Sequence, residues 1–213
     1  MLRLHGFIIS NYYNMVQHAL MAKGIEFGEV NIRPSQEPEF LQRSPMGKVP
    51  VLETPRGFLA ETDAILDYLE ESHPQPPLFP ADPFERARAR EIMKMTELYV
   101  ELPARRHLAH VLFGAELSQT AFDQVRPEVE KGLRALQRIL VLKPYATGSQ
   151  FTYADIFLLY SFNLANLLMQ RVYQWDIVAE VPGLANALEL TRGSAPGQKI
   201  AAARERAMAA MGR

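Results

Sequence analysis

The sequence predicts an α+β protein in two parts, a first part that mixes strands with helices and a second part that is all helical. Up to about residue 78, short apolar runs alternate with helical patterns in the order β α β α β β α. Five prolines then fall between residues 74 and 83, and proline continues neither a helix nor a central strand. Almost every later segment has a helical period. We therefore expect a first domain at residues 1–78, a linker at 79–84 and a helical domain at 85–213.

The first part opens with a strand and an amphipathic helix. The apolar run LRLHGFII, residues 2–9, predicts the strand, and the helix is expected from about Asn11 to Lys23. One face of this helix collects side chains spaced at i, i+3, i+4 and i+7, namely Val16, Ala19, Leu20 and Lys23. Gly24 follows, where a glycine commonly ends a helix.

The next elements complete a small mixed sheet. EFGEVNI, residues 26–32, predicts a second strand, and a short helix is possible at about residues 38–43. The turn Pro55-Arg56-Gly57 separates two apolar pieces and predicts a hairpin. A helix is expected over residues 61–73. The strand–helix–strand unit requires a parallel pair, and the hairpin adds an antiparallel edge.

The second part is predicted to be a set of helices. We expect them at about residues 84–114, 118–142, 152–171, 183–192 and 198–211. Pro103 lies inside the first helix and should kink or divide it. The segment 152–171 is strongly apolar, which is typical of a central buried helix.

Composition excludes several classes of protein. The formal net charge is −1, so no basic field favours nucleic acid or an anionic membrane. The chain has no cysteine, which excludes disulfides, thiolate metal sites and a cysteine nucleophile, and is compatible with the cytoplasm. No apolar run approaches the ~20 residues of a spanning helix. The N-terminus lacks a small-residue cleavage site, so we expect no signal peptide.

The segment SPMGKVPVLET, residues 44–54, is the most specific motif. Pro50 stands where a strand should begin, although it has no N–H to offer a ladder. One interpretation is a trans proline that opens an edge strand. The other is a cis proline, which would turn the main chain of Val49 toward a peptide-like ligand, as an added strand would pair with it.

The segment ETDAI, residues 61–65, combines a helix start with acidic residues. Thr62 starts the helix and Asp63 lies in its first turn, so Thr62 is interpretable as an ordinary N-cap. The free N–H groups and the positive end of the helix dipole also favour a carboxylate. Glu61 offers a carboxylate for an ammonium group. An amino-acid head group would satisfy both sites.

The segment GSQFTYADI, residues 148–156, predicts a capping box. Thr152 and Asp155 have the T-x-x-D spacing in which the hydroxyl and the carboxylate satisfy backbone amides reciprocally. Phe151 and Ile156 flank them as a hydrophobic staple. We expect a structural role here.

Together these segments resemble the glutathione transferase family over essentially the whole chain. S-P-M-G-K-V-P resembles the family's N-P-x-x-x-V-P segment with its cis proline, E-T-D-A-I resembles E-S-x-A-I, and G-x-x-x-T-x-A-D-I resembles the cap of the family's central helix. The resemblance implies a thioredoxin-like first domain and an all-helical second domain. It also implies a cytoplasmic homodimer in detoxification, with glutathione as co-substrate and no prosthetic group.

The same resemblance implies a glutathione site in the first part. The main chain of Val49, before Pro50, would pair with the cysteinyl part. Glu61 and Thr62 would hold the γ-glutamyl head. Lys48 is a candidate for the glycine carboxylate, a contact that varies between classes of the family.

The resemblance further implies a donor that stabilises the glutathione thiolate. Phe7 stands about where tyrosine-type classes carry their tyrosine, and it has no hydroxyl. Aligning the segment at residues 16–20 with the family's V-R-x-A-L puts Ser10 at the serine position of a serine-type site. Tyr12 falls where some relatives carry a cysteine or asparagine, and Asn11 is a third candidate. Without a ligand, Ser10 is an ordinary N-cap.

An electrophilic acceptor would bind against the long helix after the linker. Tyr99, Leu102 and Arg106, with Arg105 beside them, are candidate pocket residues, and ordinary core positions and a solvated face are the alternative. His107 and His110 are spaced to reach one metal ion, but no third ligand lies nearby and we expect no metal.

Two functions fit these observations. One is glutathione transfer to an electrophilic small molecule, or a related glutathione-dependent reduction or isomerisation. The alternative is a non-catalytic regulatory or binding protein of the same fold, resembling the stringent starvation proteins. Neither involves nucleic-acid or membrane binding by this chain.

Overall fold

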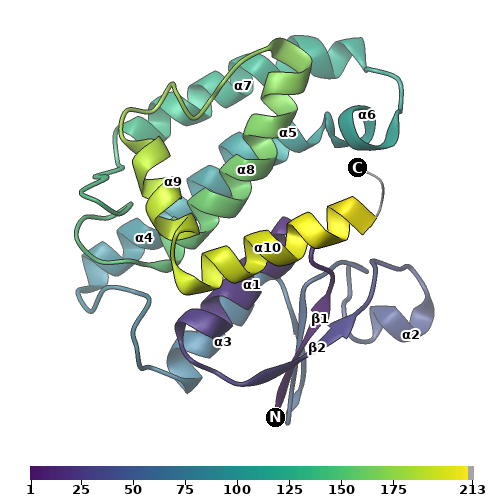
Figure 1. The fold of residues 1–213 in the computed structure, drawn as a ribbon, viewed down its shortest axis with the longest axis vertical. Helices are drawn as coiled ribbons and strands as arrows, with labels where there is room; N and C mark the ends of the chain where they lie inside the picture. The colour runs from purple at the N-terminus through teal and green to yellow at the C-terminus, as the bar shows by residue number, and fades with distance from the viewer. Residues whose placement is uncertain (211–213) are drawn as a thin grey trace. The chain divides into compact units, whose positions relative to one another are not determined.

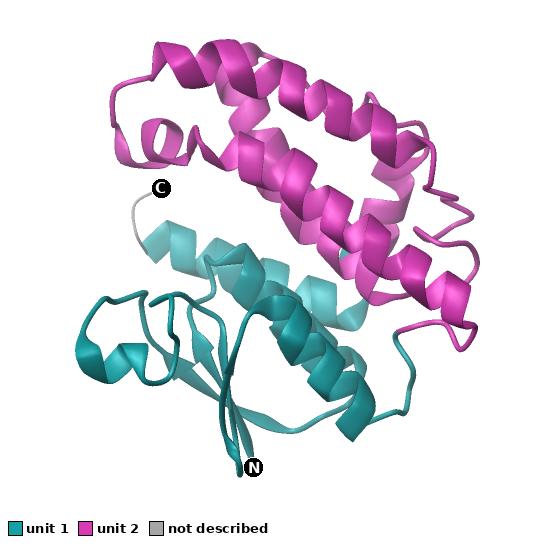
Figure 2. Cartoon of the chain, turned by 180° about the vertical axis from the view of Figure 1, so that it is seen from behind, with its two compact units in different colours: residues 1–78, 192–213 teal, residues 79–191 magenta. Residues whose placement is uncertain are grey.

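A computed structural model describes residues 1–210 of the chain. They form two compact units, shown in Figure 2. Unit 1 comprises residues 1–78 and the segment from Arg192 onward, and unit 2 comprises residues 79–191. This grouping differs from the predicted division, because the last helix belongs with the first unit and the predicted linker, residues 79–84, lies within the second. Among the described residues, no helix is both long and apolar enough to cross a membrane.

Unit 1 contains the mixed sheet that the sequence predicts. Its strands lie in the order β2-β1-β3-β4. The parallel pair β1–β2 aligns Leu2 with Phe27, and β3 runs antiparallel to both β1 and β4. The strand bounds are β1 Leu2–Gly6, β2 Phe27–Asn31, β3 Val51–Thr54 and β4 Gly57–Ala60. The α+β prediction is confirmed.

Within residues 1–210, four helices accompany this sheet, and Figure 1 shows α10 alongside α1. Their bounds are α1 Asn11–Ala22, α2 Pro38–Leu41, α3 Thr62–Ser72 and α10 Ala195–Ala210. The predicted end of the last helix, Met211, lies outside the described residues. The core between sheet and helices is fully buried and apolar, and includes Leu4, Val16, Leu20, Leu52 and Ile65.

Unit 2 is all helical. Its elements are α4 Pro83–Thr96, η1 Glu97–Glu101, α5 Leu102–Arg105, α6 Leu108–Phe113, α7 Gln119–Gln137 and α8 Tyr153–Tyr173, and α9 Leu184–Arg192 follows at its end. The predicted capping box is present at α8, where Asp155 accepts from the Thr152 amide at 2.8 Å. α8 is buried along most of its length, as expected.

The helix predicted over residues 84–114 is divided near Pro103, as expected, into α4, η1, α5 and α6. Residues 97–101 form a π-helical turn. Proline has no N–H for the carbonyl four residues earlier, which here is the carbonyl of Tyr99. α7 approaches that carbonyl closely, since a Cβ on Gly132 would lie 2.2 Å from the Tyr99 oxygen. The π-helical turn accommodates a proline that has no N–H to donate, and Gly132 leaves room for the Tyr99 carbonyl.

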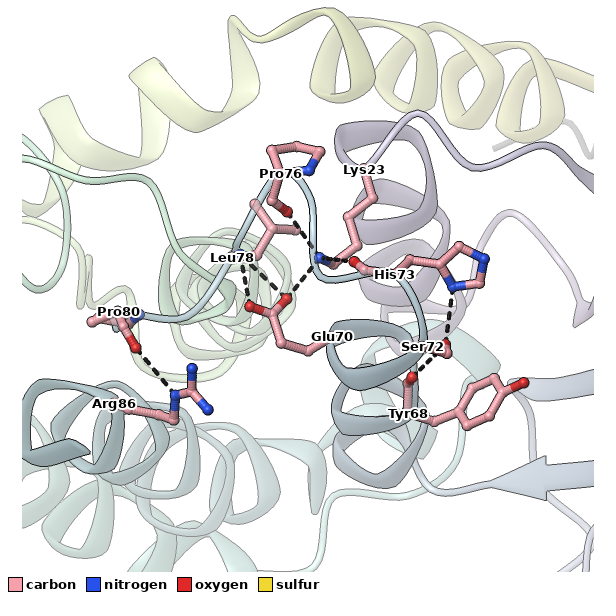
Figure 3. Close-up of polar contacts among 9 residues, drawn as sticks. All are labelled: Lys23, Tyr68, Glu70, Ser72, His73, Pro76, Leu78, Pro80 and Arg86. Atoms are coloured by element: carbon pink, nitrogen blue, oxygen red, sulfur yellow. Dashed lines mark hydrogen bonds and ion pairs between the residues drawn. The ribbon is translucent and has the colours of Figure 1, made fainter. Parts of the chain in front are cut away.

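A buried ion pair joins α1 and α3 in unit 1. The Lys23 Nζ lies 2.7 Å from Glu70 Oε2 and also donates to the carbonyls of His73 and Pro76, at 2.8 and 2.9 Å. Glu70 in turn accepts from the Leu78 amide at 3.1 Å. Figure 3 shows the Glu70 carboxylate and the carbonyls of His73 and Pro76 around the Lys23 ammonium. The sequence pattern assigned Lys23 to a buried face without identifying its partners.

Replacing Lys23 by Met should be strongly destabilising, because it leaves the Glu70 carboxylate buried without its cation. We expect a loss of about 3–5 kcal/mol in the free energy of unfolding. The control is Arg43→Met, which breaks an ion pair of the same 2.7 Å length whose carboxylate, on Glu39, is exposed. The control should cost less than about 1 kcal/mol. Equal effects in urea unfolding would contradict this account.

The buried His18 should make stability depend on pH. Its side chain is fully buried on α1, and Nε2 lies 3.4 Å from the Ser194 hydroxyl. Burial lowers the pKa of His18 from 6.5 to about 4. Between these values the unfolded chain binds a proton that the folded chain does not, so folding weakens as pH falls from 6.5 to 4, by up to about 3 kcal/mol.

The measurement is the difference in unfolding free energy between wild type and His18→Gln at pH 4.5 and pH 7. The comparison with the variant is needed because burial also raises the pKa of Asp155 to about 6. That shift makes the folded chain more stable as the pH falls, opposite to the effect of His18. The variant should be closer to wild type, or more stable, at the lower pH. A difference that does not change with pH would refute the assignment.

Candidate functional site

A tight turn joins β1 to α1 and places Ser10 at the start of the helix. The Ser10 amide donates to the Phe7 carbonyl at 3.0 Å, which closes a β-turn with Ile8 and Ile9 in its centre. Ser10 is the N-cap, and its Oγ accepts from the Tyr13 amide at 3.3 Å. A hydroxyl both accepts and donates. Within residues 1–210 the Ser10 O–H has no acceptor, so it remains able to donate to a ligand.

The other polar residues of this segment differ in how deeply their side chains are buried. Asn11 is buried and Tyr12 is partly buried. Tyr13, which the sequence analysis did not assign, is buried, and its hydroxyl donates to Glu29 Oε2 at 2.7 Å. Burial, followed by the bond to Glu29, raises the pKa of Tyr13. The Tyr13 phenol therefore links α1 to β2 and is not available to a ligand.

Gly6 allows Tyr13 to pack against the end of β1. A Cβ at Gly6 would lie 2.4 Å from Tyr13 Cδ2, and its φ of +152° is one that other residues rarely adopt. Gly6 and Tyr13 together set the distance between α1 and β1.

The loop before β3 adjoins this turn. The Val49–Pro50 peptide bond is cis, so the trans alternative is wrong. Val49 is buried in an apolar cluster with Phe40 and Val51, and the Phe7 ring packs against that cluster. The main-chain N–H and C=O of Val49 have no hydrogen-bond partner in the described part of the chain. They are therefore free to pair with an extended peptide.

Ser44 holds the preceding residue of the same loop. Its hydroxyl accepts from the Lys48 amide at 3.0 Å and donates to the Lys48 carbonyl at 2.8 Å. The Lys48 backbone is thereby fixed, whereas its side chain is exposed.

The start of α3 has an unusual backbone. Glu61 is the N-cap, with φ 66° and ψ 121°, and Thr62 is the first helical residue, so the interpretation of Thr62 as the N-cap is wrong. A non-glycine residue in such a conformation costs about 1–3 kcal/mol and often marks a functional site. The Glu61 carboxylate is exposed and has no partner among residues 1–210. Thr62 is buried.

Arg33 is a cation that the sequence analysis missed. Its guanidinium carbon lies 4.1 Å from the centroid of the Phe7 ring, within the range of a cation–π contact. No carboxylate pairs with it in the described structure. No sequence signal marks this contact, since the two residues come from different loops. It adds a positive charge beside the β1–α1 turn.

The predicted acceptor residues lie in unit 2. Tyr99 on η1 and Leu102 at the start of α5 are exposed, so the interpretation of both as ordinary core is wrong. Arg106 is exposed as well and pairs with Glu128 at 2.9 Å. Arg105 instead pairs with Glu101, which is fully buried and also accepts from the Ser161 hydroxyl at 3.0 Å.

The two histidines considered for a metal have other partners. His107 Nε2 lies 2.8 Å from the Tyr173 hydroxyl, and His110 Nδ1 lies 2.8 Å from the Ala115 carbonyl oxygen. Among the described residues, no group of three or more His, Asp or Glu side chains is arranged to hold a metal ion.

Comparison with known proteins gives a consistent result over both units. The model of the glutathione S-transferase N-terminal domain matches residues 4–77, and that of the C-terminal domain matches residues 119–189. A glutathione S-transferase of Pseudomonas putida is 43% identical over 99% of this chain and 96% of its own. A maleylacetoacetate isomerase of Pseudomonas aeruginosa is 28% identical over 93% of this chain and 97% of its own.

A solved structure agrees with these relatives. The glutathione S-transferase of Methylobacterium radiotolerans, in complex with glutathione sulfonate, matches with a TM-score of 0.74 and 26% identity, over 93% of each chain.

Proposed function

This chain belongs to the glutathione S-transferase family and is a glutathione transferase with glutathione as co-substrate, and we propose that unit 1 binds the tripeptide at the end of β1. Three segments of unit 1 would form the site, namely the turn ending at Ser10, the loop at Val49–Pro50 and the start of α3. Each offers polar groups without partners in the described residues, and each matches one part of glutathione.

The γ-glutamyl head is the part that α3 would hold. The exposed Glu61 carboxylate suits its ammonium group, and the first amides of α3 with the Thr62 hydroxyl suit its carboxylate. The free main-chain groups of Val49 suit the cysteinyl peptide in the manner of an added strand. The exposed Lys48 ammonium is our candidate for the glycine carboxylate.

Ser10 is the residue that we assign to the sulfur. The observation that carries this assignment is its O–H, which has no acceptor in the described structure. A free thiol has a pKa of about 8.5 and is mostly protonated at neutral pH. A hydrogen bond donated to the sulfur anion favours ionisation. Tyr12 and Asn11 are the alternative donors.

The thiolate would then attack an electrophilic carbon of a small molecule. A carbon–sulfur bond forms, and the electron pair of the broken bond departs with the leaving group or moves into a conjugated system. Tyr99, Leu102 and Arg106 are our candidates for acceptor binding. Isomerisation is a second candidate, which the likeness to maleylacetoacetate isomerase favours. A cytoplasmic role in detoxification fits either reaction, and a purely regulatory protein is the alternative.

Replacing Ser10 by Ala should lower conjugation of a generic aryl halide on the order of 100-fold, while glutathione affinity changes little. The matched control is Ser118→Ala, since Ser118 caps α7 with the same 3.3 Å bond to a backbone amide. Both variants should lose about 1 kcal/mol of stability, and only Ser10→Ala should lose turnover. Full activity in Ser10→Ala would transfer the role to Tyr12 or Asn11. Failure of the wild type to bind glutathione would refute the proposed site.

We also propose that the protein is a homodimer. Met46, in the loop before Val49, and Phe58 on β4 are exposed apolar side chains that a second copy would cover. Sedimentation equilibrium should give twice the 24.1 kDa of the chain. A mass of one chain at micromolar concentration would contradict the dimer.

A further inference from the structure

Asn14 is a buried polar residue whose side chain bonds to the turn that presents Ser10. It lies on the second turn of α1 and is fully buried. Its Nδ2 donates to the Ile8 carbonyl at 3.0 Å, and its backbone amide donates to the Ser10 carbonyl at 3.1 Å. One residue of α1 therefore contacts the turn at two points.

The Ile8 carbonyl belongs to the central peptide of the turn. Ile8 and Ile9 are the two middle residues between Phe7 and Ser10, and the orientation of that peptide defines the geometry of a β-turn. The bond from Asn14 fixes both the orientation of this peptide and its distance from α1. Ser10 follows it by a single residue, so the direction of its Oγ depends on the same bond.

Apart from its bond to the turn, asparagine is an unfavourable residue at this buried helical position. Asparagine is a weak helix former in a helix interior, and burying an amide costs free energy unless it is hydrogen-bonded. Its one side-chain bond goes to the loop, whereas the buried Gln17, one turn later, bonds to Glu29 on β2 at 3.0 Å. Two similar amides on the same helix thus have different partners.

We propose that Asn14 is a positioning residue for catalysis, which holds the β1–α1 turn so that the Ser10 hydroxyl is directed at the glutathione sulfur. This inference rests on the proposed role of Ser10. Asn14 does not touch the substrate. It acts through the Ile8 carbonyl. Removing the Asn14 side chain allows the turn to reorient, while the segments assigned to the rest of glutathione keep their positions.

The test compares Asn14→Leu with Gln17→Leu, two replacements that each remove one buried amide from α1. The readout is the apparent pKa of the bound glutathione thiol, taken from the pH profile of aryl-halide conjugation. In Asn14→Leu this pKa should rise by about one unit, which lowers turnover at neutral pH by up to about tenfold, with less than about threefold change in glutathione affinity. Gln17→Leu should leave the thiol pKa unchanged.

A double variant separates positioning from general destabilisation. If Asn14 acts through Ser10, adding Asn14→Leu to Ser10→Ala should lower turnover by less than about twofold further, because coupled residues are not additive. Asn14→Ala serves if the leucine variant does not fold, since alanine favours the helix and leaves room for water. The pKa of the glutathione thiol bound to Asn14→Ala should rise as it does in Asn14→Leu.

Two results would overturn the inference. One is an unchanged thiol pKa in both Asn14 variants, and the other is a tenfold additional loss in the double variant. Either result, with wild type active and Ser10→Ala impaired, leaves the proposed function standing. A wild type that binds no glutathione refutes the proposed function itself.

Discussion

The hydrogen bond from the Ser10 amide to the Phe7 carbonyl is the constraint on which the site depends. It closes the turn at the end of β1 and so sets where α1 begins. The Phe7 side chain then packs against the cluster that contains Val49, and the Ile32 amide bonds to the Gly6 carbonyl at 3.0 Å. The β1–α1 turn, the cis-proline loop and the segment after β2 are thereby fixed to one another.

In both units, the buried charged side chains named below are paired with an opposite charge. Lys23 and Glu70 in unit 1, and Glu101 in unit 2, lie in the interior, and each has a charged partner and further hydrogen bonds. Leaving such groups without partners would cost several kcal/mol. By contrast, three groups in the segments assigned to glutathione have no partner in the described residues, namely the Val49 main chain, the Glu61 carboxylate and the Ser10 O–H. This contrast is the physical basis for assigning the ligand to them.

Sequence reasoning recovered the order of elements and the motif positions because these depend on local signals. The α8 capping box and the end of α1 before Gly24 follow from residues within one turn. The contacts that it missed join distant residues. Arg33 reaches Phe7, Tyr13 reaches Glu29 and Lys23 reaches Pro76 only after the chain has folded. The π-turn at residues 97–101 needed both Pro103 and the approach of Gly132, which no single window of sequence contains.

A crystal structure of the protein with glutathione bound would show which side chain donates a hydrogen bond to the sulfur. We expect the Ser10 Oγ to lie within hydrogen-bond distance of the sulfur as its donor, with the cysteinyl peptide paired to the main chain of Val49 and the γ-glutamyl head at the start of α3. A sulfur bonded to Tyr12 or Asn11, with Ser10 Oγ turned away, would contradict it.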